Sequence, residues 1–321
     1  MGLVATPPTP GTSMRISVII PVYNRASLIG STLDSLRTQT LPPKEIVVVD
    51  DGSTDDTPGM VERYAGKFPE AGLRLVRQEN AGPSAARNRG LALAQGDLLA
   101  WCDADDLWLP RKLEKQVQRL GEDPQAAGVY CRMFKFQSDL DDLGRPEPQN
   151  MIEPPAGIPG VEHILLTMCI QSSTAVVRRS AIEGLKFDED LRAAEDALFF
   201  AEVGLRGRWL MVDEPLVAYR VHEVQLTKEA WHGVKTTEAR VAWCRAQASR
   251  IGPAAAAAWE ERLWRHLIEG VEKLYWQRNF AGLKSLRNHL AQACPELYAQ
   301  SILARKHLWP RWVYRLRDLV S

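Results

Sequence analysis

The sequence predicts an α/β protein, in which a mostly parallel sheet is flanked by helices and followed by a helical module at the C-terminus. Runs of β-branched residues, typical of strands buried on both faces, alternate with segments of helical periodicity up to about residue 120. From about residue 230 to the end, only helical periodicity remains. Alternation of this kind is characteristic of a parallel sheet whose crossover helices cover its faces.

The predicted elements follow one another from about Met14. "RISVIIPV" (15–22) predicts the first buried strand, and helical spacing over 27–39 predicts a helix with Ser27 at its N-cap. A second strand stops at Asp50 and Asp51, and a helix follows it to about Gly66. The remaining elements of this part are a strand over 73–78, a helix within 82–96 with Gly96 as its C-cap, a strand in "DLLAWCD" (97–103) and a helix over 109–120.

Changes of composition predict three parts. Residues 1–13, rich in Pro, Thr and Gly, form a flexible leader, residues 14–225 form the α/β domain, and residues 226–321 form the helical module. Within the domain, 128–137 and 172–180 predict two more strands, separated by a Pro- and Gly-rich excursion over 139–160. The helical module is distinct in composition because it holds seven of the ten tryptophans.

Composition excludes several classes of protein. With 40 basic and 40 acidic side chains, the net charge is zero, so we expect no nucleic-acid partner. Five scattered cysteines without a C-x-x-C pair indicate reduced thiols and a cytoplasmic protein, not a disulfide framework or a zinc site. No apolar run reaches the roughly 20 residues of a transmembrane helix, and the N-terminus lacks the features of a signal peptide.

Acidic side chains follow the predicted strands, where open parallel sheets bind their ligands. A dinucleotide site is disfavoured, because "PVYNRA" after the first strand has no glycine. In "DADD" (103–106), an extended chain would put Asp103 and Asp105 on one side, where Mg²⁺ or Mn²⁺ could bind with a diphosphate. The alternative is that these aspartates cap the helix expected from Pro110, and this interpretation applies above all to Asp106.

Five motifs in order resemble those of family-2 inverting glycosyltransferases of the GT-A fold, over residues 14–225. The motifs are "SVIIPVYNRASLIGSTLDSLRTQT", "EIVVVDDGSTDDT", "NAGPSAARNRGLALAQGD", "DADDLWLP" and "AAEDALFFAEVGLRG". The resemblance implies a nucleotide-sugar donor and a divalent metal. It does not extend to the helical module.

Residue roles follow from the matched positions. The resemblance assigns Pro21, Tyr23, Asp51, Arg87 and Asp103 to the donor. Among these, Tyr23 would stack on the base, Asp51 would accept a hydrogen bond from uracil N3–H, and Arg87 would lie near the phosphates. Asp50 is interpreted as a turn or packing residue. A surface helix arginine is the other interpretation of Arg87.

The metal and the base are assigned in the same way. Asp105 matches the principal metal ligand, with Asp103 beside it and His222 as a further candidate. A structural hydrogen bond is an equally good interpretation of His222. Asp196, at the start of a predicted amphipathic helix, matches the general base, although an acidic residue is also favoured at a helix N-terminus.

The sequence therefore predicts a metal-dependent, inverting, non-processive transferase. It would move one sugar from a nucleotide donor, with UDP favoured by Asp51, to a hydroxyl of a glycan or a lipid-linked acceptor. A dTDP-sugar or a GDP-sugar is the alternative donor, since thymine offers the same N3–H as uracil. A non-catalytic protein on the same fold is the alternative from another class, which intact Asp105 and Asp196 disfavour.

The C-terminal tail has an amphipathic pattern. From Pro310, Trp312, Val313, Leu316 and Leu319 share one helical face, and basic side chains lie mainly on the other. This pattern is typical of a helix in the lipid interface, so we expect peripheral contact with the inner face of the cell membrane. The alternative is that the tail packs on the helical module.

Overall fold

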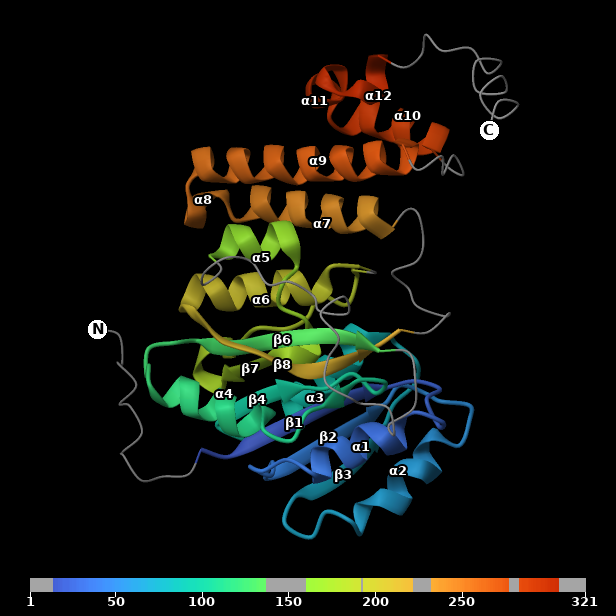
Figure 1. Ribbon diagram of the computed structural model, residues 1–321, viewed down its shortest axis with the longest axis vertical. Helices are drawn as coiled ribbons and strands as arrows, with labels where there is room; N and C mark the ends of the chain where they lie inside the picture. Colours follow the sequence, from blue (N-terminus) through green and yellow to red (C-terminus); the bar gives the residue numbers. More distant parts are fainter. Residues whose placement is uncertain (1–13, 137–159, 192, 222–231, 277–282, 306–321) are drawn as a thin grey trace. The chain divides into compact units, whose positions relative to one another are not determined.

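The computed structural model describes residues 14–136, 160–191, 193–221, 232–276 and 283–305. Contacts divide the chain into two compact units, residues 1–225 and residues 226–321, each with its own core (Figure 1). The leader over 1–13 and nearly all of the Pro- and Gly-rich excursion lie outside the described residues.

An eight-stranded sheet runs through the first unit in the order β3-β2-β1-β4-β7-β6-β8-β5 (Figure 1). The strands are β1 (Ile16–Val22), β2 (Glu45–Asp50), β3 (Gly72–Arg77), β4 (Leu98–Trp101), β5 (Leu107–Trp108), β6 (Gly128–Phe136), β7 (Ala175–Arg178) and β8 (Trp209–Arg220). β1 to β4 are mutually parallel, as are β6 and β8. The prediction of a mostly parallel α/β sheet is confirmed.

Two strands run against this direction. β7 is antiparallel to both β4 and β6, and β5 is antiparallel to β8. β5 has only two residues and was not predicted, because two residues carry no periodicity. It delays the next helix: Leu109 N–H donates to Leu216 O at 2.9 Å, which keeps the chain beside β8. The helix expected from residue 109 therefore begins at Lys112.

Six α-helices belong to the described part of the first unit. They are α1 (Ile29–Arg37), α2 (Thr57–Ala65), α3 (Pro83–Leu93), α4 (Lys112–Gly121), α5 (Val161–Thr167) and α6 (Glu195–Arg206). The predicted helices corresponding to α1 through α4 are confirmed. Both predicted caps are wrong: Leu28 is at the N-cap of α1 without a side-chain bond, and Ala94 is at the C-cap of α3.

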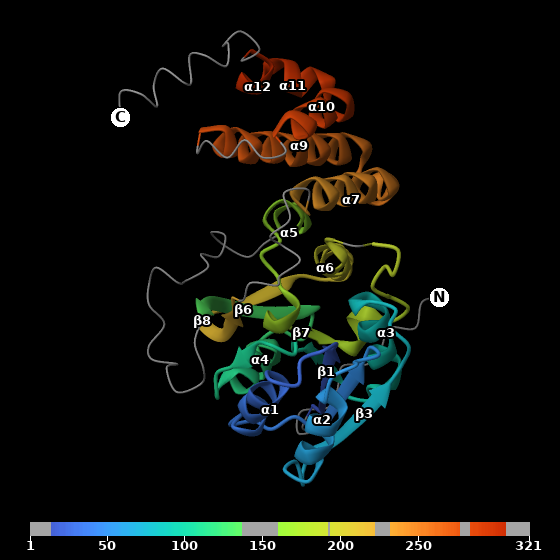
Figure 2. The same cartoon turned by 90° about the vertical axis from the view of Figure 1, so that its right-hand side faces the viewer.

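The two faces of the sheet are covered by different helices. The side chains of Val18, Ile20 and Val48 belong to one apolar cluster with residues of α1, α2 and α4. On the opposite face, Val47 and Val49 pack with Ala86 of α3. Figure 2 shows α3 and α6 on one side of the sheet and α1 and α4 on the other. This two-sided burial explains why the strands have continuous apolar sequences.

An aromatic cluster fixes α6 on its face of the sheet. Trp101 of β4 makes edge contacts with Phe187, Phe199 and Phe200, at centroid distances of 5.7, 5.5 and 5.8 Å. Phe187 stacks on Phe199 at 4.0 Å. These large buried rings pin the beginning of α6 and the segment before it against the end of β4.

The second unit is helical in its described part. Its helices are α7 (His232–Ala246), α8 (Ala248–Ile251), α9 (Pro253–Trp276), α10 (Leu283–Ala293), α11 (Pro295–Gln300) and α12 (Ile302–Arg305). Val241, Leu263, Trp264 and Leu290 are among its buried side chains. Among the described residues, no helix has both the length and the apolar character needed to cross a membrane.

Candidate active site

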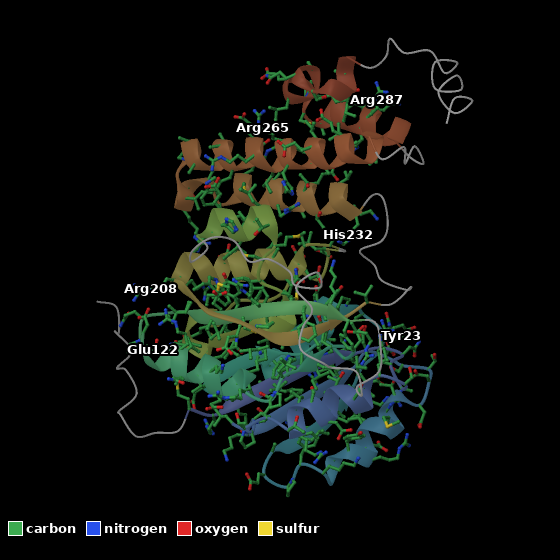
Figure 3. All side chains as sticks on the ribbon, in the orientation of Figure 1. Tyr23, Glu122, Arg208, His232, Arg265 and Arg287 are labelled. Carbon is green, nitrogen blue, oxygen red and sulfur yellow. The ribbon has the colours of Figure 1, made fainter. Side chains whose placement is uncertain are left out.

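Three strand ends bring the predicted motifs to one edge of the sheet. Val22 at the end of β1 is in register with Asp50 at the end of β2, and Cys102 N–H donates to Ile19 O at 3.0 Å. The segments after β1, β2 and β4 therefore leave the sheet together. In Figure 3, Tyr23 marks this edge, and Glu122 and Arg208 lie at the opposite one.

The segment after β1 is locked to the turn after β2. Asn24 has a φ of 50°, in the left-handed region that asparagine tolerates better than most residues. Its N–H donates to Ser53 Oγ, and its Oδ1 accepts from Thr54 N–H, both at 2.8 Å. Tyr23 is 45% exposed, the only large hydrophobic side chain so exposed in the described part of the chain. Its ring is available at the edge where the sequence placed the donor base, and Pro21 lies two residues before it in β1.

The two aspartates after β2 have different partners. Asp50 is fully buried, and its carboxylate accepts from Ser53 N–H at 3.1 Å and from Arg77 Nε at 2.8 Å. The structure agrees with its interpretation as a turn residue. Asp51 Oδ1 accepts from Gln78 Nε2 and Ala81 N–H, and its Oδ2 accepts from Gly82 N–H at 2.8 Å.

These bonds orient the Asp51 carboxylate and leave it able to accept more. An ionised carboxylate has about four acceptor positions, and the bonds just described use three of them. The backbone donors at Ala81 and Gly82 lie immediately before α3, with Gly82 at its N-cap, so the entry to this helix orients the predicted base-reading group.

The "DADD" segment is a turn, and the prediction of an extended chain there is wrong. Asp106 N–H donates to Asp103 O at 3.1 Å, which closes the turn. Thr32 Oγ1 donates to Ala104 O at 2.9 Å, and Asp103 N–H donates to Ser173 Oγ at 3.0 Å. The turn is thus fixed by α1 on one side and by the segment before β7 on the other. The capping alternative is also wrong, because Arg111 is at the N-cap of α4.

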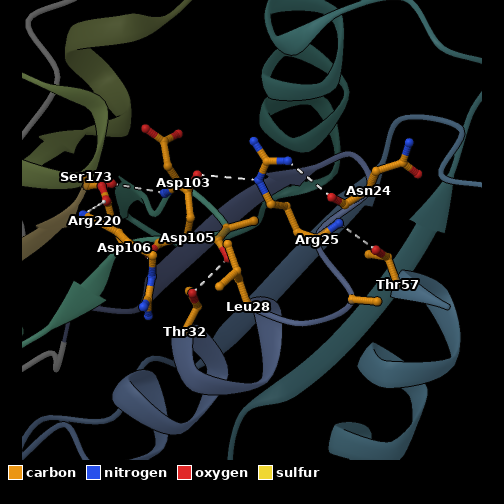
Figure 4. A network of polar contacts seen from close by, with 12 residues as sticks. Asn24, Arg25, Leu28, Thr32, Thr57, Asp103, Asp105, Asp106, Ser173 and Arg220 are labelled. Carbon is orange, nitrogen blue, oxygen red and sulfur yellow. Dashed lines mark hydrogen bonds and ion pairs between the residues drawn. The ribbon is translucent and has the colours of Figure 1, made fainter. Parts of the chain in front are cut away.

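Arginine side chains contact the turn at Asp105. Arg25 Nε lies 3.4 Å from Asp105 Oδ2, as Figure 4 shows. Arg25 is itself held by Nη1 on Asn24 O at 3.1 Å and by its N–H on Thr57 Oγ1 at 2.8 Å. The main-chain oxygen of Asp105 accepts from Arg220 Nε at 3.0 Å. Both contacts come from residues far away in the sequence.

Asp106 has a different character from its neighbours. It is 2% exposed and accepts from Arg220 N–H at 3.3 Å. Burial, together with the negative charges of Asp103 and Asp105, raises the pKa of Asp106 well above its usual range. Asp106 is therefore a buried structural group, and the partly exposed carboxylates of the turn are those of Asp103 and Asp105.

Arg87 connects this turn to the predicted base. Its Nη2 lies 3.2 Å from Asp103 Oδ1, and its Nη1 lies 3.1 Å from Glu195 Oε1. Only 8% of the Arg87 side chain is exposed, so its interpretation as a surface arginine is wrong. Glu195 is the first residue of α6 and Asp196 the second.

The environment of Asp196 suits a proton acceptor. The helix begins after Ala194, whose φ of 67° turns the chain sharply, and Ala197 N–H donates to Asp196 Oδ1 at 2.7 Å. Burial and the adjacent charge of Glu195 raise the pKa of Asp196 to about 7, against a lowering effect of Arg87. A base is most effective when its pKa lies near the working pH.

Few side chains at this edge of the sheet could act as metal ligands. No group of three or more His, Cys, Asp or Glu side chains arranged for a metal lies within the described ranges. Asp103 and Asp105, with 34% and 20% of their side chains exposed, are the oxygen ligands on offer. One or two carboxylates fit a Mg²⁺ or Mn²⁺ ion that takes its other ligands from phosphates and water. His222, the further candidate, lies outside the described residues.

The sequence did not single out Arg25, Ser173, Glu195 or Arg220 as site residues. Arg25 and Glu195 each adjoin a predicted position, and that adjacency was the available signal. Ser173 is 70 positions from Asp103 and Arg220 is 115 positions from Asp105, so no local sequence pattern could predict these contacts.

The comparisons with known proteins agree on one family. The profile described as "Glycosyl transferase family 2" matches residues 17–185, more than half of the chain. The chain belongs to glycosyltransferase family 2. The match includes the ends of β1, β2 and β4 and the "DADD" turn, and it ends before Glu195.

Curated relatives extend the similarity beyond that match. The uncharacterized glycosyltransferase EpsJ of Bacillus subtilis is 33% identical over 222 residues, which are 66% of this chain and 63% of EpsJ. An uncharacterized glycosyltransferase of Rickettsia typhi is 30% identical over 229 residues, 70% of this chain and 69% of that protein. The match to EpsJ therefore leaves more than a third of that protein without a counterpart.

Solved structures share the GT-A fold of this family. S. aureus TarS in complex with UDP-GlcNAc is 27% identical, with a TM-score of 0.60 over 84% of this chain and 76% of that one. The mannosyltransferase PcManGT of Pyrobaculum calidifontis, in complex with GDP-Man and Mn²⁺, is 25% identical. Its TM-score is 0.57, over 95% of this chain and 90% of that one. These two neighbours carry different nucleotides.

Proposed function

We propose that this chain is a metal-dependent, inverting glycosyltransferase that moves one sugar from a UDP-sugar to an acceptor hydroxyl. The observation that carries the proposal is the Arg87 bridge. It joins the carboxylate turn suited to a metal and diphosphate with the first turn of α6, where Asp196 has the pKa of a base. A leaving-group site and a proton acceptor are what a single displacement needs.

The chain's own residues account for donor binding. The exposed ring of Tyr23 would stack on the base, and the free acceptor position of Asp51 would take uracil N3–H. Asp105 and Asp103 would hold Mn²⁺ or Mg²⁺, which when bound neutralises the diphosphate and makes it a better leaving group. Pro21 lies in the last two residues of β1, just before Tyr23, and would contribute to the same donor side.

Asp196 carries the chemical step. Its carboxylate takes the proton of the acceptor hydroxyl while that oxygen attacks the anomeric carbon and the bond to the diphosphate breaks. One displacement inverts the anomeric configuration, and one base suffices because the leaving group needs no proton. All residues named in this step lie in residues 14–225, which we assign as the catalytic domain.

The acceptor and the location belong to the same proposal. We assign a glycan or a lipid-linked molecule as the acceptor, and the cytoplasm, with contact at the inner face of the membrane, as the location. A relative's name supports a glycan acceptor, since the putative teichuronic acid biosynthesis glycosyltransferase TuaG of Bacillus subtilis is 40% identical over 33% of this chain.

A thermal-shift screen tests the donor. UDP, dTDP and GDP, and their sugars, are each added with and without Mn²⁺. A ligand that binds only the folded protein raises the melting temperature. We expect UDP and UDP-sugars with Mn²⁺ to give the largest shifts. A larger shift with GDP or dTDP would replace the assigned nucleotide by that one, as PcManGT with GDP-Man illustrates.

Turnover separates catalysis from binding alone. A non-catalytic protein on this fold would bind the nucleotide without consuming its sugar. Slow release of UDP from the identified UDP-sugar by purified protein, with water as acceptor, supports the enzyme. Nucleotide binding without any release, with or without Mn²⁺ and acceptor extracts, supports the alternative.

A further inference from the structure

Arg87 is placed more like a structural clamp than like a phosphate ligand. Its two terminal nitrogens are both committed, Nη2 to Asp103 and Nη1 to Glu195. Its Nε–H is buried and has no acceptor in the structure. With 8% of its side chain exposed and a carboxylate on each terminal nitrogen, the guanidinium offers little surface to a donor phosphate, and the two negative charges oppose the approach of a third.

We propose that Arg87 is a positioning residue that ties the Asp103 turn to Glu195 and so sets the distance between the donor and the base Asp196. This inference rests on the proposed function, in which Asp196 is the base. It replaces the role near the phosphates that the family resemblance implied for Arg87. Glu195 is then also a positioning residue, because it is the partner through which Arg87 holds the start of α6.

The shape of the guanidinium suits this role. A planar fork can hold two carboxylates in a fixed geometry, whereas an ammonium group is a point charge on a flexible stem. The partners come from separate elements: Asp103 is 16 positions from Arg87 and Glu195 is 108 positions away. Fixing them to one rigid group sets their separation, which proton transfer during the displacement requires.

The neighbouring residue reinforces the connection. Asn88 Nδ2 donates to Phe187 O, and Asn88 Oδ1 accepts from Phe187 N–H, both at 2.8 Å. Phe187 also lies beneath the Arg87 guanidinium, 5.5 Å from it. Two successive residues of α3, Arg87 and Asn88, thus contact the segment that leads into α6. The position of Asp196 therefore depends on α3 as well as on its own helix.

The Arg87 bridge also affects the pKa of the proposed base, Asp196, through its charge. Burial is the largest cause of the raised pKa of Asp196; among the charges, Glu195 and Asp103 raise this pKa and Arg87 lowers it. Removing the positive charge leaves the two acidic neighbours unopposed. The acidic limb of the rate profile should then move to higher pH, a change that a purely structural arginine elsewhere would not produce.

The test compares Arg87→Lys and Arg87→Met with the matched variants Arg89→Lys and Arg89→Met. Arg89 is exposed on the same helix, so it controls for charge and helix propensity. Turnover, the Kd of UDP and the Kd of uridine are measured with Mn²⁺, and melting temperatures check folding. Asp196→Asn is assayed in parallel.

We expect Arg87→Lys to lose about 10²-fold in turnover, the scale of a small misplacement of a reacting group. UDP affinity should stay within about threefold of wild type, because the lost contact acts in the transition state. Arg87→Met should also shift the acidic limb upward. An affinity for UDP that falls tenfold or more, with uridine binding and turnover preserved, would show a phosphate ligand and overturn the inference.

A double-mutant cycle with Glu195→Gln decides the matter if the Arg87 variants fold poorly or act in several ways. Residues of one unit give non-additive effects. The double variant Arg87→Lys/Glu195→Gln should be little slower than the slower single variant, whereas additive losses would overturn the bridge. Wild-type turnover of Asp196→Asn would instead sink the proposed function, so the two failures are distinguishable.

Discussion

The three aspartates of the "DADD" turn are accommodated in three different ways. Asp103 is paired with Arg87, Asp105 is paired with Arg25, and Asp106 is buried with a raised pKa. Each arrangement removes part of the repulsion that the bare sequence suggested. The turn still offers two partly exposed carboxylates, those of Asp103 and Asp105, to a metal ion.

Asp105→Ala should abolish the metal dependence of donor binding. The variant leaves a diphosphate facing Asp103 without the principal ligand of its cation. We expect the Mn²⁺-dependent rise in melting temperature with UDP to disappear, and Asp190→Ala, at an exposed position in the loop before α6, to keep it. Wild-type binding of both Mn²⁺ and UDP by Asp105→Ala would show that Asp105 is not the ligand.

Asp196→Asn should separate chemistry from binding. The amide keeps the shape of the side chain but cannot accept the proton. Turnover should fall by about 10²- to 10⁴-fold, the usual contribution of a positioned base, while the Kd of UDP stays nearly unchanged. The control is Asp190→Asn, and near wild-type turnover of Asp196→Asn would falsify the assignment.

The raised pKa of Asp196 predicts a pH dependence. Its pKa of about 7 means that the carboxyl is protonated, and inactive as a base, at lower pH. We expect kcat/KM to rise with pH and to level off above an apparent pKa of about 7, the form that reports the free enzyme. The residual rate of Asp196→Asn should lack this limb. A limb near the ordinary aspartate value of 3.8 would contradict the assignment.

At the residue scale, the sequence predicted the candidate carboxylates and Arg87 but not the contacts between them. The matched motifs singled out Asp103, Asp105 and Asp196 as candidates, because each follows a strand or opens a helix in a recognisable pattern. Arg25 meets Asp105 across 80 positions, and Glu195 meets Arg87 across 108. Contacts of that separation depend on the completed fold and leave no periodic trace in one sequence.

At the element scale, α3 contacts more of the proposed site than its own sequence position suggests, because it links the segment after β2 with the start of α6. The two residues before α3, Ala81 and Gly82, hold Asp51, its middle carries Arg87 and Asn88, and its last turn packs closely on β1. At Gly90, a Cβ atom would collide with the buried side chain of Ile19. Glycine at this position allows the close approach that brings the helix to the sheet.

Gly90→Ala should therefore destabilise the first unit. Ile19 is fully buried and cannot move aside, so the added methyl group overpacks the interface, at a cost of about 1–3 kcal/mol. Gly121→Ala is the matched control, because the space around that exposed helical glycine is empty to 4 Å. It should be neutral or stabilising by up to about 1 kcal/mol.

Urea unfolding with an unchanged m-value measures both variants. Equal stability of Gly90→Ala and wild type would show that α3 can shift away from β1 without cost. A loss of activity larger than the loss of folded protein would further indicate that α3 sets the geometry of the site.

The elements themselves were predicted where their signals are local. β1 to β4 and α1 to α4 were recovered, because buried strands and amphipathic helices show their periods within a single element. Three elements of the first unit, β5, β8 and α5, were not predicted, and the other failures were at element ends. The cap at Ser27, the cap at Gly96 and the extended chain at Asp103 to Asp105 depended on single hydrogen bonds, and these were decided by neighbours distant in the sequence.

At the scale of the whole molecule, only the first unit contains the family match and the proposed site. The family profile ends at residue 185, within the first unit, and all residues of the proposed site lie before residue 226. The second unit has its own apolar core along α7, α9 and α10. A helical module was predicted from periodicity and tryptophan content, but periodicity reveals a buried face and not the molecule that the module serves.

The C-terminal tail carries the prediction that would give the whole molecule a location. Residues 306–321 lie outside the described residues, and the prediction rests on their amino-acid pattern. From Pro310, an apolar face would oppose Arg311 and Arg315, a pattern typical of a helix in the interface of an anionic membrane. Electrostatic attraction of this kind weakens as salt screens it.

Co-sedimentation with vesicles tests the tail against its alternative, packing on the helical module. The complete chain should pellet with anionic vesicles at low salt, less at high salt, and little with neutral vesicles. A chain ending at Leu303 should stay in the supernatant under all conditions.

A membrane-bound enzyme would meet a lipid-linked acceptor at the surface where that acceptor resides. The same truncation should therefore slow transfer to such an acceptor and leave hydrolysis of the donor unchanged. If both chains remain in the supernatant at low salt, the membrane prediction is wrong, and a lower melting temperature of the shortened chain would assign the tail to the helical module.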